Sequence, residues 1–289
     1  MGKRYIMVVD ERGFLCTETN DKILMIGVVF EYDYCIELKN KECELRKILQ
    51  GYKKEVLNSN NINIYLDDII LKENVYKNID KSERTSLINE LPQLFKSLRF
   101  TIISSSNKQD IIEVNDPYYI VTKKLLKKFY SYILKKNGES GGIIMEARGG
   151  NASYKIRQNF FDIYNEGNMC LSTSNDIKDK INTFVVCEKN NKTYGAGIEV
   201  LNVLTNIFFR VSNGLREVDK NLISYTEYGK KNKIFDIINP KICKDTQRDI
   251  PIRPLPKTRY NNSNEVNILR EQLQFRDNSI NEKEKEEMS

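Results

Sequence analysis

The feature that most constrains the fold lies almost at the start of the chain. Residues 5–9 are mostly β-prone, the run ends on Asp10, and Gly13 follows three residues later. This pattern predicts a β-strand that ends at Asp10, with Gly13 supplying the turn. A carboxylate at the end of a buried strand lies at the rim of a sheet, where it can hold a hard cation if other oxygens converge on it. The alternative is that Asp10 only hydrogen-bonds the turn formed by Arg12 and Gly13.

The rest of the chain predicts a layered α/β fold. The near-continuous apolar run over 23–30 indicates a central strand, paired as a hairpin with the first. Because strands form a hairpin first and then alternate with helices, we expect a mixed sheet with helices on both faces. The other strands are expected at 62–66 (a short strand or extended segment), 99–104, 141–146 and 183–187, and the helices at 42–57, 82–98 (kinked or broken at Pro92), 118–136, 152–165 and 197–211.

The composition changes after position 240. Prolines lie among basic residues over 251–256, Asn-rich sequence follows, and the last residues are almost all charged. We interpret residues 1–239 as one α/β domain and 240–289 as a Pro-containing arm with a charged, flexible tail. The tail is either a binding segment for a protein partner or plain disordered sequence.

The absence of histidine excludes several kinds of site. It removes Ser-His-Asp and Cys-His catalysis and every zinc site that contains histidine. Catalysis would therefore use carboxylates, Lys, Tyr, Cys, Ser, Thr or a carboxylate-held metal. The six cysteines form no Cys-x-x-Cys pair, no signal peptide is visible, and no apolar run is long enough to span a bilayer. We expect reduced thiols in a cytoplasmic protein with no membrane partner.

Two carboxylates follow predicted strands. Asp10 and Glu146 both sit at predicted strand ends, which is the arrangement of a Mg²⁺ or Mn²⁺ site. Phosphodiester hydrolysis with two metal ions uses three or four carboxylates around ions about 4 Å apart. The purely structural alternatives are that Glu146 pairs with Arg148 and that Asp67 and Asp68 cap the following segment.

Four motifs, in their order and spacing, resemble a known family, the domain-of-unknown-function family numbered 3800, whose members look like RNase H-type folds. The resemblance covers roughly residues 4–215. Residues 10–13 are similar to the family's Asp-Glu-Ser-Gly, with Arg in place of Ser; 24–30 resembles its Gly-Val-Val strand, 143–149 a later strand that ends on an acidic residue, and 195–202 the closing helix, typically Gln-x-Ala-Asp. The resemblance implies an RNase H-like mixed sheet and suggests mobile elements, phages or anti-phage defence as the setting.

The departures from the family pattern bear on the metal site. The family's closing Asp falls on Asn202, its Gln on Glu199, and its middle Glu-x-His motif on residues 63–65, beginning at Asn63. An amide binds a hard cation far more weakly than a carboxylate does. If nothing substitutes for the lost carboxylates, the site is degenerate. The purely structural alternative for Glu199 and Asn202 is that they are solvated positions on an amphipathic helix. The resemblance implies catalysis by Asp10, Glu146, Glu199 and Asn202 and metal binding by Asp10, Glu146, Glu199 and Asp68 (or Asp67).

Lysines recur along the predicted helix 118–136. Lys124, Lys128 and Lys135 share roughly one face and are able to track phosphates. Arg148 is the fourth residue predicted to bind nucleic acid. A solvated helix face explains the same lysine pattern.

The leading hypothesis is an RNase H-like protein that processes DNA or RNA as a Mg²⁺- or Mn²⁺-dependent nuclease, hydrolysing phosphodiester bonds. The alternative is a catalytically degenerate RNase H-like module that binds nucleic acid or a protein partner. A third hypothesis is an unrelated α/β binding protein, which applies if the carboxylates do not converge.

Overall fold

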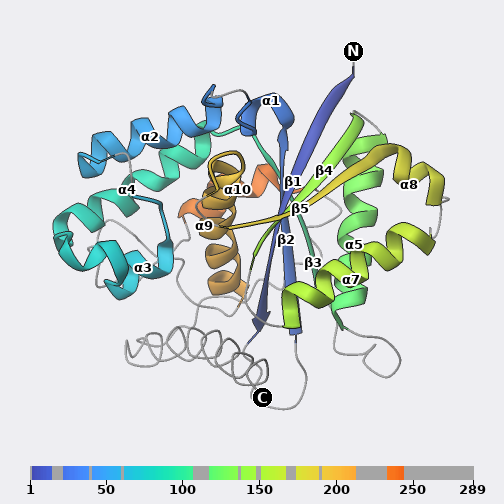
Figure 1. The fold of residues 1–289 in the computed structure, drawn as a ribbon. Helices are drawn as coiled ribbons and strands as arrows, with labels where there is room; N and C mark the ends of the chain where they lie inside the picture. The colour runs from blue at the N-terminus through green and yellow to red at the C-terminus, as the bar shows by residue number, and fades with distance from the viewer. Residues whose placement is uncertain are drawn as a thin grey trace, which may run out of the picture.

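The protein is described from a computed structural model. The structure describes residues 2–14, 22–38, 41–59, 62–106, 117–135, 138–147, 151–166, 174–188, 191–212 and 233–243. A central twisted sheet runs through the molecule, with helices on both of its faces (Figure 1).

The described residues form a five-stranded mixed sheet with the order β3-β2-β1-β4-β5. The strands β1, β2 and β3 are antiparallel neighbours, whereas β4 and β5 run parallel to β1 on its other side. This topology is consistent with an RNase H-like fold, and the predicted α/β class is confirmed. The strand bounds are β1 (Lys3–Phe14), β2 (Lys22–Glu31), β3 (Thr101–Ser106), β4 (Gly138–Glu146) and β5 (Ile181–Cys187).

Alternation of side chains along the strands divides the core into two clusters. In β1, Ile6 and Val8 point into one cluster, and Met7 and Val9 point into the other. Figure 1 shows α2 (Glu44–Leu57), α3 (Leu66–Leu71), α4 (Lys81–Ser97), α9 (Gly195–Ser212) and α10 (Lys233–Ile238) on the first face, and α5 (Pro117–Lys128), α7 (Asn151–Glu166) and α8 (Ser174–Lys180) on the second. Short elements complete the described helices: α1 (Tyr32–Cys35), the 3-10 turns η1 (Asn74–Asn78) and η4 (Asn239–Lys241), and the π-helical η3 (Phe129–Leu134).

The first strand is longer than the sequence predicts. Asp10 does not end β1: it pairs with Ile26 of β2, and β1 continues to Phe14. The strand continues past Gly13 because β2 goes on supplying an antiparallel partner for its backbone. What ends next to Asp10 is the parallel pairing with β4, whose last register partners are Val9 and Met145. The predicted hairpin is confirmed, and its tip lies outside the described residues.

Three local predictions can be compared directly with the structure. Of the short strand or extended segment predicted over 62–66, residues 62–65 form no strand, whereas Tyr65 has an extended backbone. The helix α3 then begins at Leu66, because Leu66, Ile69 and Ile70 bury one helical face. Of the kink or break predicted at Pro92, the break is absent: α4 continues past Pro92, since buried Leu91 and Phe95 hold the helix to the core. The helix predicted over 118–136 is present as α5, which passes directly into η3.

The predicted boundary between 239 and 240 falls inside η4, so the folded body continues to at least Cys243. Ile242 bridges to Ile102 at the edge of the sheet, and the Cys243 N–H donates to the Ile102 carbonyl at 2.9 Å. The Lys241 ammonium donates to carbonyls at the end of α4, including that of Phe95 at 2.6 Å. Residues 244–289, the rest of the predicted tail, lie outside the described residues.

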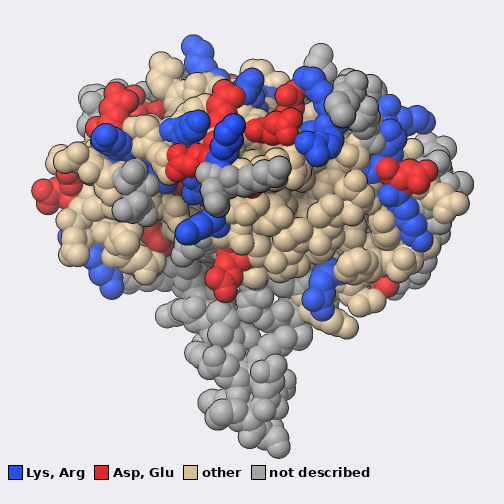
Figure 2. Space-filling view, turned by 45° about the horizontal axis from the view of Figure 1, so that its top comes forward, with Lys and Arg blue, Asp and Glu red and all other residues tan. Residues whose placement is uncertain are grey.

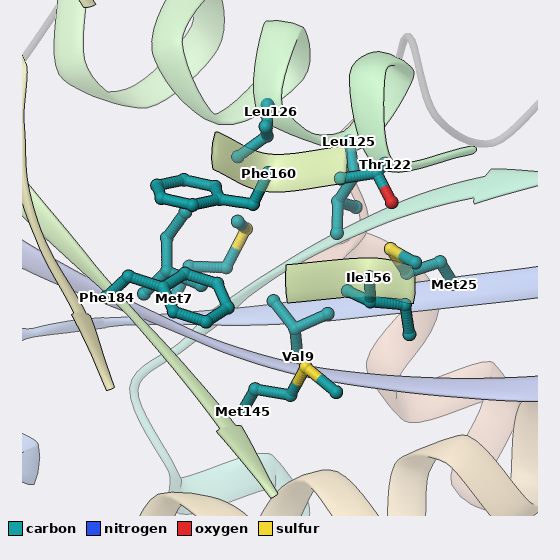
Figure 3. A pocket seen from close by; sticks show the side chains of 11 residues that line it. Met7, Val9, Met25, Thr122, Leu125, Leu126, Met145, Ile156, Phe160 and Phe184 are labelled. Atoms are coloured by element: carbon teal, nitrogen blue, oxygen red, sulfur yellow. The ribbon is translucent and has the colours of Figure 1, made fainter. Parts of the chain in front are cut away.

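A small cavity lies between the sheet and helices α5 and α7 (Figure 3). Its volume of about 10 Å³ is no larger than one water requires. The lining is apolar apart from Thr122, and it includes Met7, Val9 and Phe160. Asp10 lies on the opposite face of β1, so we assign this cavity to core packing.

Candidate functional site

The structure brings Asp10 and Glu146 together. Val9 and Met145 are register partners in parallel strands, so the next residues, Asp10 and Glu146, occupy adjacent positions. Both side chains point to the α9 face, the face of Val8 and Ile144. They are only 1% and 3% exposed. The Glu11 N–H donates to Asp10 Oδ1 at 2.9 Å, a contact with the strand rather than with the turn at Gly13.

Helix α9 adds Asn202 to this pair. The Asn202 Nδ2 donates to Glu146 Oε2 at 3.3 Å and to the Ile198 carbonyl at 3.1 Å. The helix can approach the sheet because position 197 is glycine: a Cβ there would lie 2.9 Å from both the Cys35 sulfur and a Val8 methyl. Asn202 is therefore in contact with the Glu146 carboxylate.

Glu199 is turned to a different partner. The Lys53 ammonium donates to its two carboxylate oxygens at 3.1 and 3.2 Å, and the Ile64 N–H donates to Oε1 at 2.7 Å. The Lys53 and Glu199 side chains are 3% and 4% exposed, so this is a buried ion pair. Burial raises the pKa of Glu199, and Lys53 and the Ile64 N–H oppose that shift. The predicted role of Glu199 as a metal ligand has no contact in its favour.

The two aspartates at the start of α3 also have protein partners. The Arg12 Nη2 donates to Asp67 Oδ2 at 2.7 Å, and the Asn206 amide donates to the other oxygen of Asp67. Asp68 Oδ2 accepts from the Asn74 amide at 2.9 Å. Asp67, not Asp68, is thus linked to β1 and α9.

Tyr65 lies within the electrostatic influence of these acids. Burial raises its pKa, and the charges of Glu199, Glu146 and Asp68 raise it further, while a hydrogen bond from Asn63 has the opposite effect. The Asn63 amide donates to the Tyr65 hydroxyl at 3.3 Å. The described contact of the Asn63 amide is therefore a hydrogen bond to the Tyr65 side chain.

Sequence reasoning missed four residues of this region: Arg12, Lys53, Tyr65 and Asn206. The replacement of the family's Ser by Arg12 was a usable signal, and Asn206 stands one helical turn beyond Asn202. Lys53 carried no signal, since a lysine on an amphipathic helix is normally solvated.

The donor set suits one hard cation. Two adjacent buried carboxylates are ligands that Mg²⁺ or Mn²⁺ accepts when water and substrate phosphates complete the shell. The Asn202 amide turns its N–H, which cannot ligate a cation, toward Glu146. Within the described ranges, no group of three or more Asp, Glu or Cys side chains is arranged to hold a metal ion. The carboxylate count of a two-ion centre is therefore not met by these residues.

The predicted phosphate-tracking lysines do not form one exposed row. Lys124 donates to the Ser106 carbonyl at 3.2 Å and Lys128 to the Ser104 carbonyl at 2.7 Å, and both are half-buried. They satisfy outward-facing carbonyls of the edge strand β3, which is a common protection of a sheet edge. Lys135 is exposed, and Arg148 lies outside the described residues. On the face in Figure 2, Lys and Arg are interspersed with Asp and Glu.

Comparisons of the chain with family models, curated proteins and solved structures found no match. The resemblance to family 3800 thus stays a prediction that rests on the motifs.

Two further expectations concern compartment. Over the described ranges, no helix has the length and apolarity to cross a membrane. The described cysteines, Cys35, Cys43, Cys187 and Cys243, are free thiols, in line with the expected reduced state. Cys16 and Cys170 lie outside the described residues.

Proposed function

We propose that the protein hydrolyses phosphodiester bonds in nucleic acid with one divalent cation, Mg²⁺ or Mn²⁺, held by Asp10 and Glu146. The observation that carries the proposal is the adjacent register of these two buried carboxylates on parallel strands. Two such groups repel each other as anions where the dielectric is low, and a shared cation relieves that repulsion. Proteins commonly bind Mg²⁺ with only one or two carboxylates when substrate phosphates complete its coordination shell.

The surrounding residues have distinct roles in this proposal. Asn202 orients the Glu146 carboxylate through its amide N–H and stands at the helix position where the family carries an acid. Glu199 is a structural residue, because its charge is already balanced by Lys53. When bound, the cation polarises a phosphoryl oxygen and neutralises the charge that develops on it.

The test is cleavage of labelled DNA and RNA strands during a Mn²⁺ titration, with wild type, Asp10→Asn and Glu146→Gln. Matched controls are Asp33→Asn and Glu44→Gln, which change exposed carboxylates in surface ion pairs. Mn²⁺ binding is measured on the same proteins by electron paramagnetic resonance, independently of turnover. We expect cleavage and tight Mn²⁺ binding to be lost together in the two site variants and kept in the controls. Cleavage that is equal in all five proteins would refute the proposal.

A second candidate function is a non-cleaving RNase H-like module that binds nucleic acid. The observation in its favour is that the other nearby acids are taken: Glu199 by Lys53 and Asp67 by Arg12. Its signature is nucleic-acid binding without cleavage, unchanged by Asp10→Asn, Glu146→Gln or Mn²⁺.

A further inference from the structure

We infer that Arg12 is a binding residue for a nucleic-acid phosphate and that Asp67 occupies its place until the phosphate arrives. The inference deepens the proposed function and rests on it for the identity of the ligand. Arg12 lies two residues after Asp10 in β1, on the same face of the strand. That spacing is about 7 Å along the strand, within reach of an arginine side chain.

The guanidinium of Arg12 is buried with donors to spare. Its side chain is 9% exposed, and Nη2 is engaged by Asp67 at 2.7 Å. The Arg12 Nε is buried and has no hydrogen-bond partner among the described residues. A buried guanidinium with an unused N–H is matched by an oxyanion that accepts two parallel hydrogen bonds, which phosphate does well.

Asp67 has the properties of a stand-in anion. Its side chain is 12% exposed, it lies in the first turn of α3, and Asn206 donates to its other oxygen. If Arg12 turns to a phosphate, the Asn206 amide still donates a hydrogen bond to Asp67. The exchange therefore replaces one carboxylate on Arg12 by one phosphate and leaves neither acid without a donor.

Position along β1 favours a phosphate over another anion. Arg12 lies beyond the last register pair of β1 with β4, next to the Asp10 and Glu146 positions. A phosphodiester held there would meet the arginine and the carboxylate-bound cation on one side of the strand. A nucleic-acid backbone carries one phosphate per nucleotide, so a single strand of DNA or RNA can present one phosphate to Arg12 and a neighbouring one to the carboxylate-bound cation.

The experiment measures binding of fluorescein-labelled DNA and RNA single strands by anisotropy, in EDTA, over a series of salt concentrations. The variants are Asp67→Asn, which removes the competing anion, and the double variant Arg12→Gln/Asp67→Asn, which leaves no buried unpaired charge. The matched control for the double variant, Arg99→Gln/Glu44→Gln, removes an exposed arginine–glutamate pair and, like the double variant, leaves the net charge unchanged. Circular dichroism confirms that each protein is folded.

We expect Asp67→Asn to bind about tenfold more tightly and the Arg12→Gln/Asp67→Asn variant about tenfold more weakly than wild type. The salt slope of the double variant should fall in magnitude by about 0.7, the value for one lost phosphate contact on a single strand. The control should match wild type. Wild-type affinity and slope in both Asp67→Asn and the double variant would overturn the inference, as would wild-type protein that binds neither strand. If the wild-type protein shows no Mn²⁺-dependent cleavage while the expected binding shifts are present, the hydrolysis proposal is refuted and the assignment of Arg12 is kept.

Discussion

Replacing Lys53 by methionine should severely destabilise the protein, because it leaves Glu199 buried without its cation. The pair is 3% and 4% exposed, with nitrogen–oxygen distances of 3.1 and 3.2 Å. Breaking a buried ion pair from one side costs about 3–5 kcal/mol, a large share of the roughly 5–15 kcal/mol by which domains are stable. The measurement is urea unfolding followed by circular dichroism at pH 7.

The double variant Lys53→Met/Glu199→Gln is the control for that prediction. Glutamine keeps an oxygen for the Ile64 N–H, and methionine fills the volume of the lysine stem. Since both charges leave together, we expect stability within about 2 kcal/mol of wild type. The double variant should also retain Mn²⁺-dependent cleavage, because Glu199 is not a cation ligand in the proposed site.

The pH dependence gives the same prediction a second readout. Burial already raises the pKa of Glu199, and removal of Lys53 takes away the largest opposing effect. As pH rises above about 4.5, the unfolded state of Lys53→Met loses this proton before the folded state does. Stability should therefore fall by about 1.4 kcal/mol per pH unit until the folded pKa is reached. A Lys53→Met protein that loses less than about 1 kcal/mol, or whose loss is the same at pH 5 and pH 7, would refute the reasoning.

Three further predictions follow from local contacts. Gly197→Ala should destabilise the protein by about 1–3 kcal/mol and reduce cleavage, because the added Cβ collides with the sheet. Gly51→Ala, in open space on α2, should instead stabilise the protein by about 0.5–1 kcal/mol. Thermal melts measure both changes in stability. Burial, and then the Glu146 charge, raise the pKa of Cys187 to about 11. Glu146→Gln should therefore speed the alkylation of Cys187 at pH 8 several-fold, as followed by peptide mass spectrometry. An unchanged rate would show that the Glu146 charge does not act on the Cys187 thiol. Burial raises the pKa of Cys35 above its ordinary 9.0, so the unfolded thiol ionises first and this residue should contribute a fall in stability of about 1.4 kcal/mol per unit above pH 9. Cys35→Ala should lessen the measured slope by that amount in urea titrations, while the raised pKa values of Cys43 and Cys187 maintain the rest.

The fold was largely predictable from local patterns. Apolar runs over 23–30 and 141–146 lie within β2 and β4, and the pattern over 197–211 corresponds to α9. These elements follow the sequence because both faces of the sheet are covered, so continuous hydrophobicity marks central strands directly. The sequence singled out Asp10 and Glu146 as carboxylates at strand ends, but Asp10 lies inside β1, and the two are neighbours because the parallel β1–β4 pairing ends at Val9 and Met145.

The sequence alone determined the element order, the exclusion of histidine chemistry and the two central carboxylates. Only the tertiary structure decided which partners the other acidic side chains contact. In the sequence, Glu199 and Asp67 are equally suitable as metal ligands. In the structure they form ion pairs with Lys53 and Arg12, which come from segments distant in the chain. The physical reason is that a buried charge is costly unless an opposite charge lies beside it. Which opposite charge that is depends on the packing of α2, α9 and β1, and no local sequence pattern predicts that packing.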